Sequence, residues 1–246
     1  MQGRNEFTKK LENLIRDCSV VFCGPANYLS KLDYGKRIDD ADIVIRTNDA
    51  YAIPDRFKKQ YGSKCDILYI NNSWIRRNLL RNRNPSHLRN LIKEIIAYQR
   101  VKLVVVKGDK SKNVVKHYFE KVIPSFEDHL EIHKTSFNWR EDRELWYAGN
   151  DASETKYYEP TLLSYIISDL SAVGVFNKIL ITGCDFYSFE KHWGEFYNKT
   201  VNPTKEVKLR EKSHDMFADI QYLKRKLSLN KKIKCDKQIE EIIQNH

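Results

Sequence analysis

Polar residues suited to binding a nucleoside follow three successive apolar runs of the chain. They are Asn27 within the turn Gly24-Pro25-Ala26-Asn27, Asn48 and Asn71, which come at the ends of the runs 19–24, 43–46 and 65–70. An asparagine amide both donates and accepts hydrogen bonds, which suits a pyrimidine ring and a ribose, and glycine lets a ligand approach the backbone closely. Each asparagine alone is also an ordinary turn residue. Their recurrence at three run ends favours a binding site.

A fourth apolar run brings a carboxylate to the same predicted edge. Residues 179–187 read ILITGCDFY, so the run stops at Gly183 and is followed by Asp185. This pattern is typical of a buried parallel strand that delivers polar groups to its carboxyl end. Open α/β sheets hold their ligands at that edge. We therefore expect the chemistry of this chain there.

Alternating helices and strands must position these residues. Apolar residues at helical spacing predict helices over 5–16, 85–98, 110–122, 161–173 and 216–227, the first of them on the sheet edge. A central strand at 101–106 and a short one at 232–235 add to the four runs named above. We predict a single Rossmann-like α/β domain over residues 1–246, with a mostly parallel central sheet flanked by helices. Residues 124–159 show no period, and the charged residues 188–212 predict a mobile lid.

Composition limits the partners and the location of the chain. The excess of 43 Lys and Arg over 33 Asp and Glu gives a net charge of +10, which favours anionic partners without selecting one. Basic clusters with aromatic residues could bind nucleic acid, but there is no RNP, KH or zinc-finger pattern, so we expect no nucleic-acid partner. No apolar run approaches the ~20 residues that span a bilayer, and residues 1–15 lack a signal-peptide core. We expect a cytoplasmic protein, or one whose anchor has been removed, with peripheral membrane association and oligomerisation left open.

Several segments, in one order along residues 18–227, carry a family resemblance. They are residues 20–50 (VVFCGPANYLSKLDYGKRIDDADIVIRTNDA), Pro160-Thr161 ahead of GCDFY, Lys191-His192-Trp193, and His214 with Asp219 and Ile220. They resemble the large, small, third and very small sialyl motifs of glycosyltransferase family 29, the eukaryotic-type sialyltransferases. CDILYINNS and GCDFY are also similar to segments of the bacterial sialyltransferases of family 42.

The resemblance implies transfer of sialic acid from CMP-sialic acid to a glycan or glycolipid hydroxyl with inversion, on a variant of the GT-A fold. The imidazole of His214 is suited to act as general base near neutral pH. Oriented donors must stabilise the departing CMP phosphate, and we expect Tyr187 and His192 in that role. Asp185 is expected to orient its neighbours. The expected donor-binding residues are Gly24, Pro25, Asn27, Asn48, Asn71, Thr161, Asp185 and Tyr197.

Two metal sites are conceivable, and we expect neither. Asp39, Asp40 and Asp42 include the DxD spacing that binds a divalent ion under a nucleotide diphosphate in many glycosyltransferases, but a CMP donor has a single phosphate. His129 and His133 would share a helix face and could hold zinc, yet no cysteine or carboxylate cluster completes that site, so we expect surface histidines. The five cysteines form no CxxC pair and are expected to be reduced, mostly buried thiols. No metal or other cofactor is therefore expected.

Alternative functions remain open at this point. A CMP-Kdo-dependent Kdo transferase would use a similar 2-keto acid sugar on the same nucleotide. A non-catalytic nucleotide- or nucleic-acid-binding protein would keep the binding edge without turnover. Without the motif, we would interpret His214 as a solvated residue beside a helix N-terminus.

Overall fold

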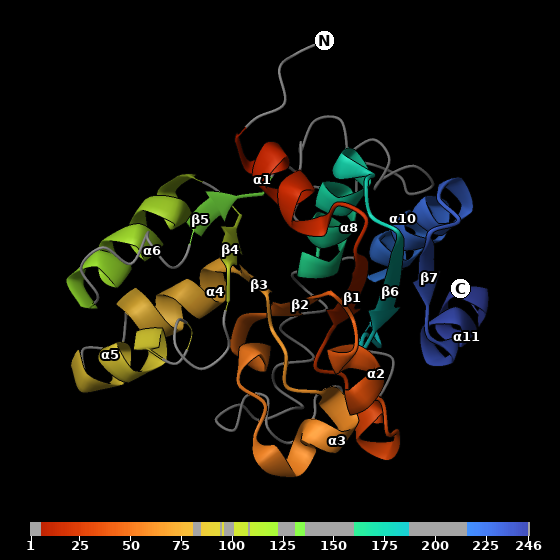
Figure 1. Ribbon diagram of the computed structural model, residues 1–246, viewed down its shortest axis with the longest axis horizontal. Helices are drawn as coiled ribbons and strands as arrows, with labels where there is room; N and C mark the ends of the chain where they lie inside the picture. Colours follow the sequence, from red (N-terminus) through yellow and green to blue (C-terminus); the bar gives the residue numbers. More distant parts are fainter. Residues whose placement is uncertain are drawn as a thin grey trace.

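The computed structural model describes residues 6–80, 85–93, 95, 101–107, 109–122, 131–135, 160–186 and 216–245. At its centre is a parallel sheet of seven strands in the order β5-β4-β3-β2-β1-β6-β7 (Figure 1). The strands are β1 (Ser19–Cys23), β2 (Ile43–Thr47), β3 (Ile67–Ile70), β4 (Leu103–Val106), β5 (Glu131–Lys134), β6 (Lys178–Thr182) and β7 (Ile233–Cys235). The parallel sheet flanked by helices confirms the predicted Rossmann-like α/β fold.

The strands form where the chain can bury side chains on both faces of the sheet. Every residue of β2, β3 and β4 is buried, as expected for parallel strands covered by helices on both sides. Alternate side chains enter different clusters: Phe22 and Ile45 pack on one face, whereas Val21 and Val44 pack on the other. The register also sets Cys23 opposite Thr182, so that β1 and β6 end at the same level.

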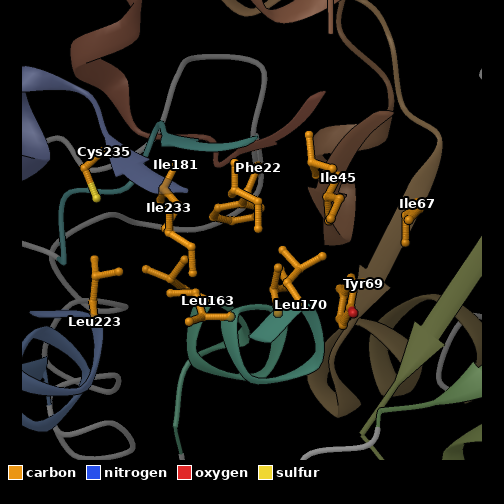
Figure 2. Close-up of a cluster of buried hydrophobic side chains, with 14 of the residues drawn as sticks. Phe22, Ile45, Ile67, Tyr69, Leu163, Leu170, Ile181, Leu223, Ile233 and Cys235 are labelled. Carbon is orange, nitrogen blue, oxygen red and sulfur yellow. The ribbon is translucent and has the colours of Figure 1, made fainter. Parts of the chain in front are cut away.

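Three helices, α1 (Glu6–Ile15), α8 (Leu162–Val173) and α10 (Met216–Leu229), cover one face of the sheet. Helix α8 lies between the other two and contacts both. Figure 2 shows Leu163 and Leu170 of α8 facing the strand side chains, among them Phe22. Helix α1 buries Phe7, Leu11 and Ile15 in this core and also reaches the edge strand β5, where Lys10 forms an ion pair with Glu131. Helix α11 (Lys237–Asn245) extends the same cluster beside β7.

The opposite face carries two further buried clusters, one under β1 and β2 and one under β3 and β4. The elements on that side are η1 (Asn27–Lys31), α2 (Gly35–Asp39), η2 (Asn48–Tyr51), η3 (Asp55–Phe57), α3 (Lys58–Tyr61), α4 (Asn72–Ile75), η4 (Arg76–Leu80), α5 (Pro85–Lys93) and α6 (Asp109–Val122). Among the described residues, no helix is both long enough and apolar enough to cross a membrane.

Strand β5 is the element that sequence patterning missed. Its residues read EIHK, with one aliphatic side chain, Ile132, between polar neighbours, so no apolar run marks it. His133 therefore lies on a strand at the end of the sheet, and the expectation that it is a surface residue on a helix is wrong. Its side chain is buried, its ring centroid is 5.9 Å from that of Phe7, and its Nε2 is 3.0 Å from Glu131. His129 lies outside the described residues.

The five cysteines are all free thiols, as predicted. Cys23, Cys65 and Cys235 are buried, and Cys18 and Cys184 are partly exposed. Burial raises the pKa of the Cys65 thiol from its ordinary value of 9.0 to about 12. Between these two pH values the unfolded chain loses a proton that the folded chain keeps. The contribution of Cys65 to stability is therefore complete below about pH 9 and decreases as the pH rises toward 12.

Cys65 should resist alkylation for the same reason. We expect iodoacetamide at pH 8 to leave Cys65 unlabelled in the native protein and to label it fully in urea, because only a thiolate reacts. Mass spectrometry of the Cys65 peptide measures the labelled fraction, and the partly exposed Cys18 is the internal comparison. Equal labelling rates of the two thiols in the native protein would contradict the prediction.

Candidate functional site

The strand order reverses between β1 and β6. From β1 the chain builds β2, β3, β4 and β5 toward one side of the sheet, and then returns to place β6 and β7 on the other side. The loops that follow β1 and β6 therefore lead away from each other, and such a switch point at the carboxyl ends of parallel strands is where open α/β sheets bind ligands. Gly24 directly follows β1, and Gly183 directly follows β6.

The backbones of these two glycine turns touch. Gly24 N donates to Thr182 O and Ala26 N donates to Gly183 O, each over 2.9 Å. A Cβ atom on Gly24 would lie 2.2 Å from Gly183 O, and one on Gly183 would lie 2.3 Å from Gly24 O. Gly183 also has a φ of +72°, in the left-handed region. Only glycine at both positions allows this contact.

The predicted donor-binding residues Pro25, Asn27 and Asp185 lie in the same two turns. Pro25 follows Gly24, and Asn27 begins η1. Asp185 is buried, two residues after Gly183, and the next residue, Phe186, has a φ of +48°. Positive φ values at residues other than glycine are uncommon and are concentrated at functional sites. The structure therefore brings these three residues to the switch point.

Asn48 and Asn71 form a second polar group at the ends of β2 and β3. Asn48, with a φ of +49°, accepts a hydrogen bond from Asn71 N at its Oδ1 over 3.0 Å. Asn71 Oδ1 in turn accepts from Trp74 N over 2.8 Å, within the first turn of α4, and Trp74 Nε1 donates to Asp49 over 2.7 Å. The two predicted asparagines are therefore neighbours, and both side-chain oxygens also serve the local structure of this edge.

The N-terminus of α8 reaches this edge as well. Because Gly174 ends α8 shortly before β6 begins, the helix starts at the carboxyl ends of the strands, with Thr161 as its N-cap residue. Asp219, in the first turn of α10, accepts from Thr161 N over 3.2 Å and from the Ser164 hydroxyl. Within the described part of the chain, Thr161 Oγ1 is a buried atom with no hydrogen-bond partner. The two hydrogen bonds to Asp219 hold the first turns of α8 and α10 side by side.

The acidic residues of the DxD stretch lie at the other end of the sheet, because they come just before the first residue of β2. Asp39 accepts from Ser63 N over 2.8 Å and Asp42 from Ser19 N over 2.7 Å. Among the described residues, no group of three or more His, Cys, Asp or Glu side chains could hold a metal ion. Asp40 pairs with Lys36 on the surface, over 2.6 Å. This placement gives each of the three aspartates a partner and separates them from the switch point.

The family model described as Glycosyltransferase family 29 (sialyltransferase) matches residues 2–230, nearly the whole chain. The chain belongs to this family. It is therefore a CMP-sugar-dependent glycosyltransferase, and its predicted resemblance to family 29 is confirmed. No curated protein sequence matches the chain significantly.

Solved sialyltransferases share the fold of this family 29 enzyme. A mammalian sialyltransferase in complex with Gal-beta-1-3GalNAc-ortho-nitrophenol is similar with a TM-score of 0.54 and 13% identity, over 96% of this chain and 75% of that one. A second structure of a mammalian sialyltransferase gives 0.53 and 14%, over 96% and 81%. A variant of the sialyltransferase CST-II in complex with CMP gives 0.51 and 15%, over 87% and 80%.

The remaining predicted residues of this family 29 enzyme, Tyr187, His192, Tyr197 and His214, lie outside the described residues, as does the predicted lid, 188–212. Two residues at the switch point were not predicted. Tyr28 Oη and the buried carboxylate of Asp236 are 2.6 Å apart. A signal was present for Asp236, which directly follows the predicted short strand at 232–235, but the pairing of β7 with β6 is not visible in the sequence.

Proposed function

We propose that the chain transfers sialic acid from CMP-sialic acid to a glycan hydroxyl with inversion and without a metal. The observation that carries this proposal is the pair of touching glycine turns at the switch point, with Asp185 and Asn27 beside them. The donor would lie over these turns. Gly24 and Pro25 would give it access to the backbone, and Asn27, Asn48 and Asn71 would provide amide groups for cytidine and ribose.

The start of α8 is the second support for the donor site. Thr161 has a buried hydroxyl oxygen at the N-terminus of a twelve-residue helix, where backbone N–H groups and the helix dipole favour an anion. The CMP phosphate is such an anion. Asp185 would orient neighbouring groups, and Tyr197 would add a contact from the segment 188–212, which we propose acts as a lid.

The reaction requires one proton transfer and one charge to be stabilised. The acceptor oxygen attacks the anomeric carbon of the sialyl group while the bond from that carbon to the CMP phosphate oxygen breaks. His214 takes the proton of the acceptor hydroxyl as general base, and Tyr187 and His192 donate hydrogen bonds to the leaving phosphate. In support, His214 precedes α10 by two residues in the sequence, and the first turn of α10 packs against the start of α8 through Asp219.

The charge of the donor supports the proposal that the enzyme needs no metal. CMP carries a single phosphate, so less negative charge develops on the leaving group than on a nucleoside diphosphate, and hydrogen-bond donors can balance it. The DxD aspartates, at the opposite end of the sheet, are bound to Ser19 and Ser63. We expect a chelator to leave the initial rate of transfer unchanged, and a loss of rate that added Mg²⁺ or Mn²⁺ restores would refute this part of the proposal.

The test uses CMP-sialic acid and CMP-Kdo as alternative donors over a panel of glycan and glycolipid acceptors, with CMP release as the measurement. Transfer from CMP-sialic acid, with an inverted anomeric product by NMR, is the expected result. Transfer from CMP-Kdo alone would identify a Kdo transferase, and CMP binding without transfer from either donor would identify a non-catalytic nucleotide-binding protein. Vesicle sedimentation and light scattering, run on the same protein, report peripheral membrane binding and oligomeric state.

A further inference from the structure

A chain of buried and partly buried hydrogen bonds runs from the last strand of the sheet into the glycine turns. The Tyr28 hydroxyl donates to Asp236 Oδ2 over 2.6 Å and accepts from Gly183 N over 2.7 Å. The Thr182 hydroxyl donates to the same oxygen of Asp236. The other carboxylate oxygen accepts from Ile239 N over 3.0 Å, at the start of α11. Asp236, only 4% exposed, thus joins β6, η1 and α11.

The direction of these bonds is fixed by the groups that make them. An ionised carboxylate only accepts hydrogen bonds, and Asp236 faces three donors. Burial raises the pKa of the Tyr28 hydroxyl, and the nearby Asp236 raises it further, so Tyr28 keeps its proton and remains a donor. Hydrogen bonds to a charged acceptor are stronger than neutral ones. The chain is therefore a firm connection between β7 and the backbone of Gly183.

This connection holds the parts of the predicted donor site together. Gly183 N is bound by Tyr28, and Gly183 O accepts from Ala26 N, so the same peptide turn is held from both sides. Asn27 is the neighbour of Tyr28 in the chain, and Asp185 is two residues beyond Gly183. Without the hydroxyl, the buried N–H of Gly183 would lose its acceptor, and the turn would have to move to find another.

We propose that Tyr28 and Asp236 are positioning residues of the donor site, which act through the backbone of Gly183 without touching the donor. The inference rests on the proposed function, since it takes the glycine turns as the place where the CMP-sugar binds. It also assigns a role to a residue beyond the segment 2–230 that the family model matches. The last strand and helix would then be part of the donor site and not only of the core.

The test is Tyr28→Phe in the full chain. We expect CMP to bind about tenfold more weakly by calorimetry and the KM for the CMP-sugar to rise by a similar factor, because one hydrogen bond to the turn is lost. The KM for the acceptor should stay the same. Asp236→Asn keeps an oxygen for Ile239 N and so the start of α11, but it cannot serve all three donors, and its effect on CMP binding should be at least as large.

Tyr69→Phe is the matched control. Tyr69 also donates a buried hydrogen bond to a carboxylate, that of Asp169, over 2.9 Å, but from β3 and α8 and not at the glycine turns. We expect it to lower Tm and leave CMP affinity unchanged. If Tyr28→Phe and Asp236→Asn also lowered Tm and left CMP affinity unchanged, both residues would be purely structural and the inference would be wrong. Where either variant folds only in part, the CMP-induced shift in Tm of its folded fraction gives the same comparison.

Different results would overturn the proposed donor site and the positioning role of Tyr28 and Asp236. If the unaltered protein neither bound CMP nor used a CMP-sugar, the proposed donor site itself would be wrong. If it did both, and the Tyr28 and Asp236 variants kept its CMP affinity and donor KM, only the positioning role would be overturned.

Discussion

Replacing Gly183 by alanine is expected to disrupt both the fold and the reaction. The new Cβ atom would lie 2.3 Å from the backbone oxygen of Gly24, and the residue would have to keep a φ of +72°. Both the new Cβ atom and the Gly24 oxygen are fixed to the backbone and cannot rotate away as the end of a side chain would. The two turns must therefore separate. We expect a loss of about 3–5 kcal/mol in the free energy of unfolding. Displacing the donor by about 1 Å would lower the transfer rate by about a hundredfold.

Gly174→Ala is the control for the backbone conformation alone. Gly174 also has a positive φ, of +68°, but among the described residues a Cβ there would have only Ser171 O within 4 Å, at 3.8 Å. The left-handed conformation costs alanine about 1–2 kcal/mol, and the transfer rate should not change. Thermal unfolding and CMP release measure both variants. Equal losses of stability in the two would show that the contact between the glycine turns adds nothing to the conformational cost.

The second large effect is expected at His214. Changing it to alanine should lower the transfer rate by about 10²–10⁴-fold, the usual contribution of a general base, while CMP affinity remains unchanged. An unperturbed imidazole titrates near pH 6.5, so the rate of the unaltered enzyme should fall on the acid side as the base is protonated. In the alanine variant this acid limb should disappear.

His117→Ala, on the exposed side of α6, is the control for removing a histidine. It should keep the rate and the pH profile of the unaltered enzyme. A His214→Ala variant that turned over normally would mean that another group removes the proton. A variant that lost CMP binding and rate together would instead place His214 in the donor site.

Most of the sheet could be predicted because its strands are continuous apolar runs. For β1, β2, β4 and β6, burial on both faces selects the kind of sequence that a run at 43–46 or 101–106 displays. Strand β5 could not be predicted, since a single Ile132 between polar residues pairs with β4 only because the rest of the sheet is already there. Local pattern therefore predicts the interior strands and β7 at one end of the sheet, but not β5 at the other end.

The candidate site also has a part that could be predicted from the sequence and a part that could not. The sequence shows that Asn27, Asn48, Asn71 and Asp185 follow apolar runs, because each stands within three residues of the end of its run. That Gly24 must touch Gly183, and that Asp236 holds Tyr28, depends on pairing between β1, β6 and β7, which are far apart in the chain. Such contacts are set by topology, and no local spacing encodes them. The connection between Asp219 and Thr161 is of the same kind.

The partnership of β1 with β6 also has a consequence during protein synthesis. β1 is complete once residue 23 has left the ribosome, yet one of its two neighbours consists of residues 178–182. Until these emerge, a nascent sheet ends in an unprotected apolar strand, which readily pairs with other chains. We expect translation products that stop before residue 178 to aggregate or to be captured by chaperones, whereas the finished enzyme has that strand covered.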